Sequence, residues 1–157
     1  MNRKKTLKGI IFSALACIAI YSCTHVSGTY TSTNGSRSGS SMKDNCMDCH
    51  KTGATEGAFI VAGTVFHTDS VTRYPNGTVY LYSGPDSAAG PRDTVLASVE
   101  IDGVGNFYTT RPIDLSGGFY PVVVSSSGIS DTMKSSTKIG SCNSCHGTSV
   151  KGGIFVH

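Results

Sequence analysis

The chain has 157 residues, with 13 lysines and arginines against 10 acidic residues. Four of the basic residues lie in the first eight positions, so the remainder of the chain carries 9 − 10 = −1 formal charges. The lysines and arginines form no cluster along the chain, which argues against a nucleic-acid partner. Beyond its N-terminal segment, the length suits one domain with a single hydrophobic core.

Residues 1–22 have the pattern of an export signal. A cationic start precedes an uncharged, mostly apolar run from Gly9 to Ile20, which is shorter than the roughly 20 apolar residues of a membrane-spanning helix and fits a signal peptide. Residues 20–23 resemble the lipobox of bacterial lipoproteins, which implies that Cys23 is lipidated. The alternative is ordinary cleavage near Ser22, with Cys23 left as a free thiol. We expect an exported protein that a lipid anchors to a membrane of the cell envelope, facing the periplasm or the surface.

The segment from 23 to 41 is small and polar and has no periodic apolar pattern. Such a composition predicts a flexible tether, in which His25 is a solvated residue. The folded domain is therefore expected to span residues 42–157.

A short motif, Cys-x-x-Cys-His, occurs twice in this domain. The first copy holds Cys46, Cys49 and His50, and the second holds Cys142, Cys145 and His146. The motif is the attachment signature of a c-type haem. The spacing lets both thiols reach the two vinyl groups of the porphyrin, and the adjacent histidine then lies beneath the iron as an axial ligand. We therefore predict two covalently bound haem c groups.

Two structural explanations of the cysteines stay open. They could form a pair of disulfides, or all four could bind one zinc ion. Zinc ribbons usually separate their cysteine pairs by about 15–20 residues, whereas residues 50–141 intervene here. Neither explanation accounts for the histidine that follows each pair. With Cys17 in the signal and Cys23 lipidated, no cysteine is left for a disulfide.

A haem that only carries electrons needs a second axial ligand, and histidine or methionine serves. For the second haem the candidates are His157, 11 residues after the motif histidine, and Met133, nine residues before its first cysteine. For the first haem the candidate is His67, 17 residues after His50. The alternatives are a mobile C-terminal histidine, a packed methionine and a surface histidine. Met47 lies inside its own motif and cannot reach around the ring.

The region between the motifs has β-strand patterns separated by glycine- and proline-rich turns. Five strands are predicted, with a possible sixth, polar strand before the second motif; they cover residues 59–67, 78–82, 94–101, 107–110, 119–124 and 131–138. No convincing amphipathic helix is present, so we expect a mostly-β, antiparallel sandwich, with a few helical residues after each motif. Pro121 should lie on an edge strand or at a bulge near a strand's start. An even number of strands would bring the two motifs to one end of the domain, and an odd number would separate them.

Residues 59–125 resemble the carboxypeptidase regulatory-like, or transthyretin-like, β-sandwich family. The resemblance rests on Gly63-Thr64-Val65, on Val79-Tyr80-Leu81, on the run from Asp102 to Phe107 and on the run from Gly118 to Val123. It implies an Ig-like or transthyretin-like sandwich that binds or spaces other groups and carries no chemistry of its own. Asp102 and Asp114 lack the Asp-x-Asp-x-Asp-Gly pattern of a calcium loop, so we expect solvated turn acids.

Together these features predict a dihaem c-type cytochrome that exchanges electrons with redox partner proteins of the envelope and is not an enzyme. The alternative is a lipid-anchored β-sandwich binding module with structural cysteine pairs. A peroxidase-type dihaem enzyme would need acid or base groups beside an open iron. The two glutamates of the chain are Glu56 and Glu100, and the sequence places neither beside a motif histidine.

Overall fold

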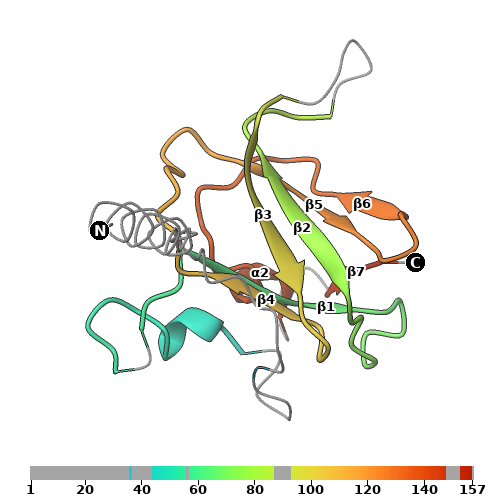
Figure 1. Ribbon diagram of the computed structural model, residues 1–157, viewed down its shortest axis with the longest axis horizontal. Helices are drawn as coiled ribbons and strands as arrows, with labels where there is room; N and C mark the ends of the chain where they lie inside the picture. Colours follow the sequence, from blue (N-terminus) through green and yellow to red (C-terminus); the bar gives the residue numbers. More distant parts are fainter. Residues whose placement is uncertain (1–35, 37–43, 56, 87–92, 148–152, 157) are drawn as a thin grey trace, which may run out of the picture.

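The computed structural model describes Ser36 and residues 44–55, 57–86, 93–147 and 153–156. These residues form seven strands and two helical turns, shown in Figure 1. In chain order they are η3 (Cys46–Asp48), β1 (Val61–Phe66), β2 (Gly77–Tyr82), β3 (Val95–Ile101), β4 (Asn106–Thr109), β5 (Tyr120–Val124), β6 (Ser130–Thr132), α2 (Asn143–His146) and β7 (Ile154–Phe155).

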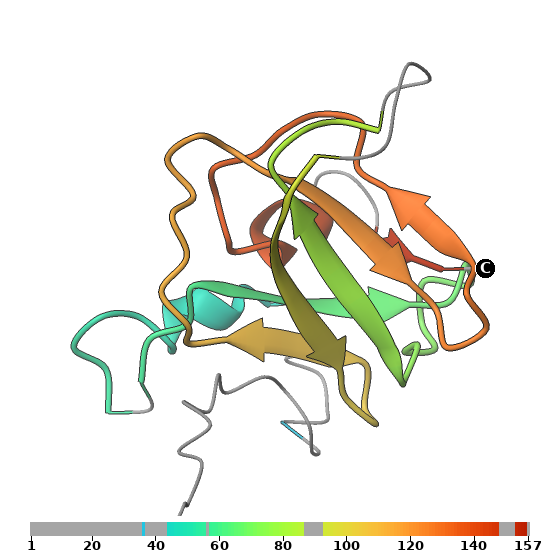
Figure 2. The same cartoon turned by 45° about the horizontal axis from the view of Figure 1, so that its top comes forward.

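The strands form two sheets, with the orders β4-β1-β7 and β3-β2-β5-β6. Figure 2 shows one sheet packed over the other, with their strands crossing steeply. Every paired strand is antiparallel to its neighbour except the short β7, which runs parallel to β1. The predicted mostly-β, sandwich-like fold is confirmed, and its first five strands lie within two residues of the expected positions.

Three local predictions differ from the structure. The polar sixth strand is only three residues long, Ser130–Thr132, and Thr137 pairs with Phe119 through an isolated bridge. The helical turns lie within the two motifs rather than after them. Pro121 lies in an interior strand, between β2 and β6, but at its second residue. Its carbonyl accepts a hydrogen bond from the Met133 amide, just past the end of β6, so its missing N–H faces the side where that ladder stops.

The core lies between the two sheets and takes buried side chains from both. Its largest members are Phe107, Phe119 and Leu81, and valines from β1, β2, β3 and β5 fill the space between them. The chain's last described residue, Val156, is also fully buried there. The tail after the second motif is thereby tied to the fold, because β7 pairs with the end of β1.

Strand β1 is buried along its whole length rather than on alternate residues. It is the central strand of its sheet, and the helical turns of both motifs contact it. Covered on both faces, it resembles the buried strands for which alternation disappears. Of the strands between the motifs, β1 is therefore the one on which both motifs rest.

Asp102 is not the solvated acid that the sequence suggested, because only 2% of its surface is exposed. Its carboxylate accepts hydrogen bonds from the amides of Val104 and Asn106 in the turn between β3 and β4. It also accepts two from Ser36, one from the amide and one from the hydroxyl, at 3.0 and 2.6 Å. Ser36, the one described residue of the predicted tether, is thus bound to the folded part. Asp114 is exposed and accepts from the Ser116 amide, as expected of a turn acid.

Among the residues that the structure describes, no helix has the length and apolarity needed to cross a membrane.

Candidate functional site

The second motif is fastened to β1 by backbone hydrogen bonds. The Ala62 amide donates to the Gly140 carbonyl and the Cys142 amide donates to the Ala62 carbonyl, both at 2.9 Å. Gly140 makes this approach possible, since a Cβ there would collide with the carbonyl oxygen of Ile60. The turn α2 then begins directly after Cys142 and carries Cys145 and His146.

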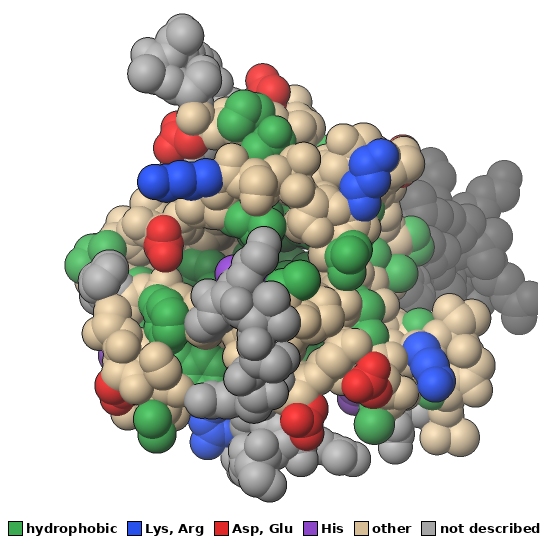
Figure 3. Space-filling view, turned by 180° about the vertical axis from the view of Figure 1, so that it is seen from behind, with side chains coloured by type: hydrophobic (Ala, Val, Ile, Leu, Met, Phe, Trp, Pro, Cys, Tyr) green, Lys and Arg blue, Asp and Glu red, His purple; other side chains and the backbone are tan. Residues whose placement is uncertain are grey.

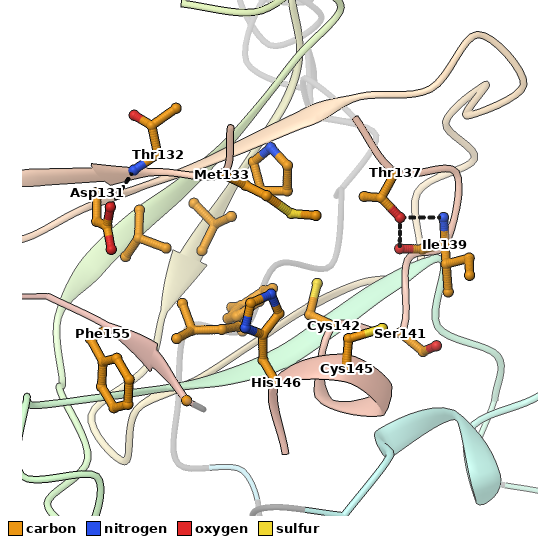
Figure 4. A pocket seen from close by; sticks show the side chains of 16 residues that line it. Asp131, Thr132, Met133, Thr137, Ile139, Ser141, Cys142, Cys145, His146 and Phe155 are labelled. Atoms are coloured by element: carbon orange, nitrogen blue, oxygen red, sulfur yellow. Dashed lines mark hydrogen bonds between the residues drawn. The ribbon is translucent and has the colours of Figure 1, made fainter. Parts of the chain in front are cut away.

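Three residues of the second motif line one cavity of about 190 Å³, namely Cys142, Cys145 and His146. Figure 4 shows Met133 on the opposite wall, facing His146 across the space. Most of the remaining lining is apolar and comes from both sheets and the tail, including Val79, Phe107, Val123, Ile139, Ile154 and Phe155. Figure 3 shows a hollowed face of the molecule in which hydrophobic side chains surround a histidine.

His146 is one of several polar residues that line this cavity, together with Asp131, Thr132, Thr137 and Ser141. Its Nδ1 atom is buried and has no hydrogen-bond partner among the described residues. A buried polar atom without a partner is costly, and water or another group beyond the described residues can supply the partner.

In the folded chain, the first cysteine of each motif, Cys46 or Cys142, has a thiol that is a poor nucleophile. Burial raises the pKa of Cys142 to about 12, with smaller contributions from the neighbouring Cys46 and Cys145. Burial also raises the pKa of Cys46, and the charges of Asp44 and Asp48 act in the same direction. Both thiols are therefore protonated at neutral pH in the folded chain.

The first motif lies on the turn η3, whose start is capped by Asn45. The side chain of Asn45 accepts from the Met47 amide and donates to the Asp48 carboxylate. Cys46 is half-buried and Cys49 is exposed. The chain returns to the motif just before β1, where the Phe59 amide donates to the His50 carbonyl.

An aromatic stack fixes the ring of His50. The imidazole lies 3.9 Å from the ring of Phe59 at an interplanar angle of 9°, and Phe59 stacks in turn on Tyr108 at 4.4 Å. If His50 binds the iron of a haem at the first motif, this stack would hold its imidazole in one orientation.

The two motifs lie side by side, which answers the question that the strand count left open. Six strands separate them in the described chain, an even number, so the chain returns to the end at which it began. Contact is made by Asn143, whose Nδ2 donates to the Asp44 carbonyl at 3.1 Å and lies 3.9 Å from Cys46 Sγ.

Other predicted ligands are placed less favourably or lie outside the described residues. His67 follows the far end of β1 from Phe59, and its ring contacts Tyr74, so the structure does not bring it to His50. Met47 stays within its motif. The predicted ligand His157 lies outside the described residues, as do the predicted lipidation site Cys23 and the tether residue His25.

The residues at the second motif have the chemistry that a covalently attached haem would need. Within the described ranges, no three cysteine, histidine or acidic side chains converge as the ligands of one ion would, and the four described cysteines are free thiols. At the second motif two thiols, an imidazole and a thioether line one mostly apolar cavity. A porphyrin is larger than this cavity, so part of it would extend beyond the opening.

Sequence reasoning missed Asn143, Phe59, Tyr108 and Gly140. No local pattern marks them, because each acts through a contact with a segment distant in sequence.

Comparison with known proteins found no match to this chain among protein-family models, curated proteins or solved structures.

Proposed function

We propose that this protein is an electron-transfer cytochrome with two covalently attached c-type haems, anchored to the cell envelope by a lipid at Cys23. The observation that carries the proposal is the second motif's cavity. Cys142, Cys145 and His146 line it together, and Met133 faces the histidine from the opposite wall.

Each residue of this cavity has a separate role. Cys142 and Cys145 would hold the porphyrin through thioethers, and His146 and Met133 would supply ligands to its iron. When bound, the haem supplies a one-electron couple. The mostly apolar walls would lower the local dielectric, and a thioether ligand would raise the reduction potential. The second site is therefore the higher-potential candidate.

The first motif holds its haem nearer the surface. Cys46 and Cys49 would be the attachment points, and His50, whose ring stacks on Phe59, would supply a ligand to the iron. Because Cys49 is exposed, this site is the more accessible one for a redox partner protein. No role as an enzyme is proposed.

A pyridine haemochrome spectrum tests the proposal. The chain is expressed with a c-haem maturation system, and the expected content is two haems per chain. The double variants C46S/C49S and C142S/C145S should each retain one. A matured wild-type chain without haem would refute the proposal and favour a β-sandwich binding module with structural cysteines.

Ligation by Met133 has a spectroscopic test of its own. Ferric haem with a methionine ligand has a weak near-infrared absorption band, which Met133→Ala should abolish while the haem content stays at two. Met47→Ala is the matched control, since Met47 lies within the first motif, and it should leave the band unchanged. Persistence of the band in Met133→Ala would show that another residue is the ligand.

A further inference from the structure

Asn143 is a buried polar residue that the haem signature does not require. It occupies a variable position of the second motif, yet only 5% of its surface is exposed. Its side chain bonds to two segments distant in sequence, strand β1 and the residues just before the first motif.

The orientation of the Asn143 amide follows from its partners. The Thr64 N–H donates to Oδ1 at 2.9 Å, so Nδ2 must be the atom that faces the Asp44 carbonyl at 3.1 Å and the Thr64 hydroxyl at 3.2 Å. An N–H can only donate and a carbonyl can only accept, so a flipped amide would lose both contacts. This one side chain therefore joins the second motif to β1 and to the first motif at once.

Strand β1 holds Asn143 through a longer polar chain. The Thr64 hydroxyl donates to Asn106 Oδ1 at 2.8 Å, and Asn106 Nδ2 donates to the Ser36 hydroxyl at 2.7 Å. Ser36 donates in turn to Asp102. Buried polar groups linked in this way cost free energy if any one is left unsatisfied, so the position of Asn143 is fixed from both sides.

The link brings the first cysteines of the two motifs, Cys46 and Cys142, close to each other. Asn143 directly follows Cys142 in the chain, and its amide lies 3.9 Å from the sulfur of Cys46. Both sulfurs are attachment points under the proposed function, so the porphyrin edges that they carry start from neighbouring positions.

We propose that Asn143 is a positioning residue that fastens the two attachment segments into one unit and thereby holds the two haems as a close pair. The pairing of the haems rests on the proposed function, whereas the link between the two segments rests on the hydrogen bonds of Asn143 alone.

Circular dichroism in the Soret band of the matured, full-length protein tests the close pair. Two chromophores held near each other at a fixed angle produce a split signal with lobes of opposite sign. The wild-type spectrum should contain this split, and the sum of the spectra of C46S/C49S and C142S/C145S should lack it. A wild-type spectrum equal to that sum would overturn the proposal.

The role of Asn143 is tested by Asn143→Asp. This isosteric change keeps an acceptor for the Thr64 N–H but removes the donor to the Asp44 carbonyl. We expect two haems per chain with most of the split lost, whereas the control Ser144→Ala, an exposed variable position of the same motif, should keep it. A full split in Asn143→Asp would contradict the role. If Asn143→Asp does not fold, the comparison of wild type with C46S/C49S and C142S/C145S, which each keep one haem, still decides whether the haems are paired.

A failure of the proposed function has a different signature. In that case wild type carries no haem, and the segment link is measured by the alkylation rate of the Cys46 thiol in the haem-free chain. Asn143→Asp should raise this rate several-fold over Ser144→Ala. Equal rates would overturn the link.

Discussion

At the scale of single residues, buried polar side chains link the two motifs and Ser36 to the sandwich. Asp102 and Asn143 lie at opposite ends of one chain of hydrogen bonds, through Ser36, Asn106 and Thr64. Burial acts to raise the pKa of the Asp102 carboxyl, but hydrogen bonds from Ser36, Asn106 and Val104 outweigh it, and the net pKa is lowered. The folded state therefore prefers the ionised carboxylate.

Replacing Asp102 tests this preference. Asp102→Asn should lower the free energy of unfolding at pH 7 by about 2–3 kcal/mol, because hydrogen bonds to a charged group are lost. The measurement is urea denaturation followed by circular dichroism. Asp114→Asn, at an exposed turn, is the control and should have a much smaller effect.

The difference in unfolding free energy between wild type and Asp102→Asn should depend on pH, and the direction of the lowered pKa fixes its sign. A carboxyl whose pKa is lower in the folded state contributes stability above its unfolded pKa, which is about 4. That contribution is lost as the pH falls through the lowered folded value. The gap between wild type and Asp102→Asn should therefore shrink below about pH 4. A gap that stays constant into acid would contradict the assigned protonation state.

At the scale of elements, the position of the second motif depends on close backbone contact with β1. Gly140 allows that contact, because the Ile60 carbonyl occupies the space that a side chain would need. Sequence reasoning could find the strand and the motif, since alternating apolar residues and the cysteine spacing are local signals. It could not find their packing, because a glycine required by a distant carbonyl has the same local pattern as a glycine in an open turn.

Gly140→Ala should displace the second motif from β1. We expect an unfolding free energy lower by about 1–3 kcal/mol, the usual cost of forcing extra volume into a packed contact, and a reduced haem content at the second site. Gly117→Ala is the matched control, since nothing lies within 4 Å of its added Cβ. Thermal unfolding and the haemochrome spectrum measure the two effects. Equal stability of the two variants would show that the close contact is not required.

At the scale of the whole molecule, the sandwich brings together two motifs that are 96 residues apart in the sequence. The fold class could be predicted, because short strands with glycine and proline turns permit few other architectures. The adjacency could not, since it depends on whether the polar residues before the second motif form a strand. The three-residue β6 makes the number of intervening strands even.

The cavity at the second motif likewise combines residues that the sequence could identify with contacts that only the packing shows. The cysteines and histidines were identifiable from their spacing, and Met133 was one of several candidates. Packing distinguishes Met133 from His67, because Met133, just after β6, lines the cavity of the second motif, while β1 carries His67 away from the first. His157 lies outside the described residues.

The central claim is that four cysteine sulfurs are bonded to porphyrin. Peptide mass spectrometry of the matured chain tests it most directly. The account predicts that the peptides with Cys46 and Cys49, and with Cys142 and Cys145, each carry the mass of one haem. Unmodified cysteines at all four positions in a host that matures other c-type cytochromes would contradict it.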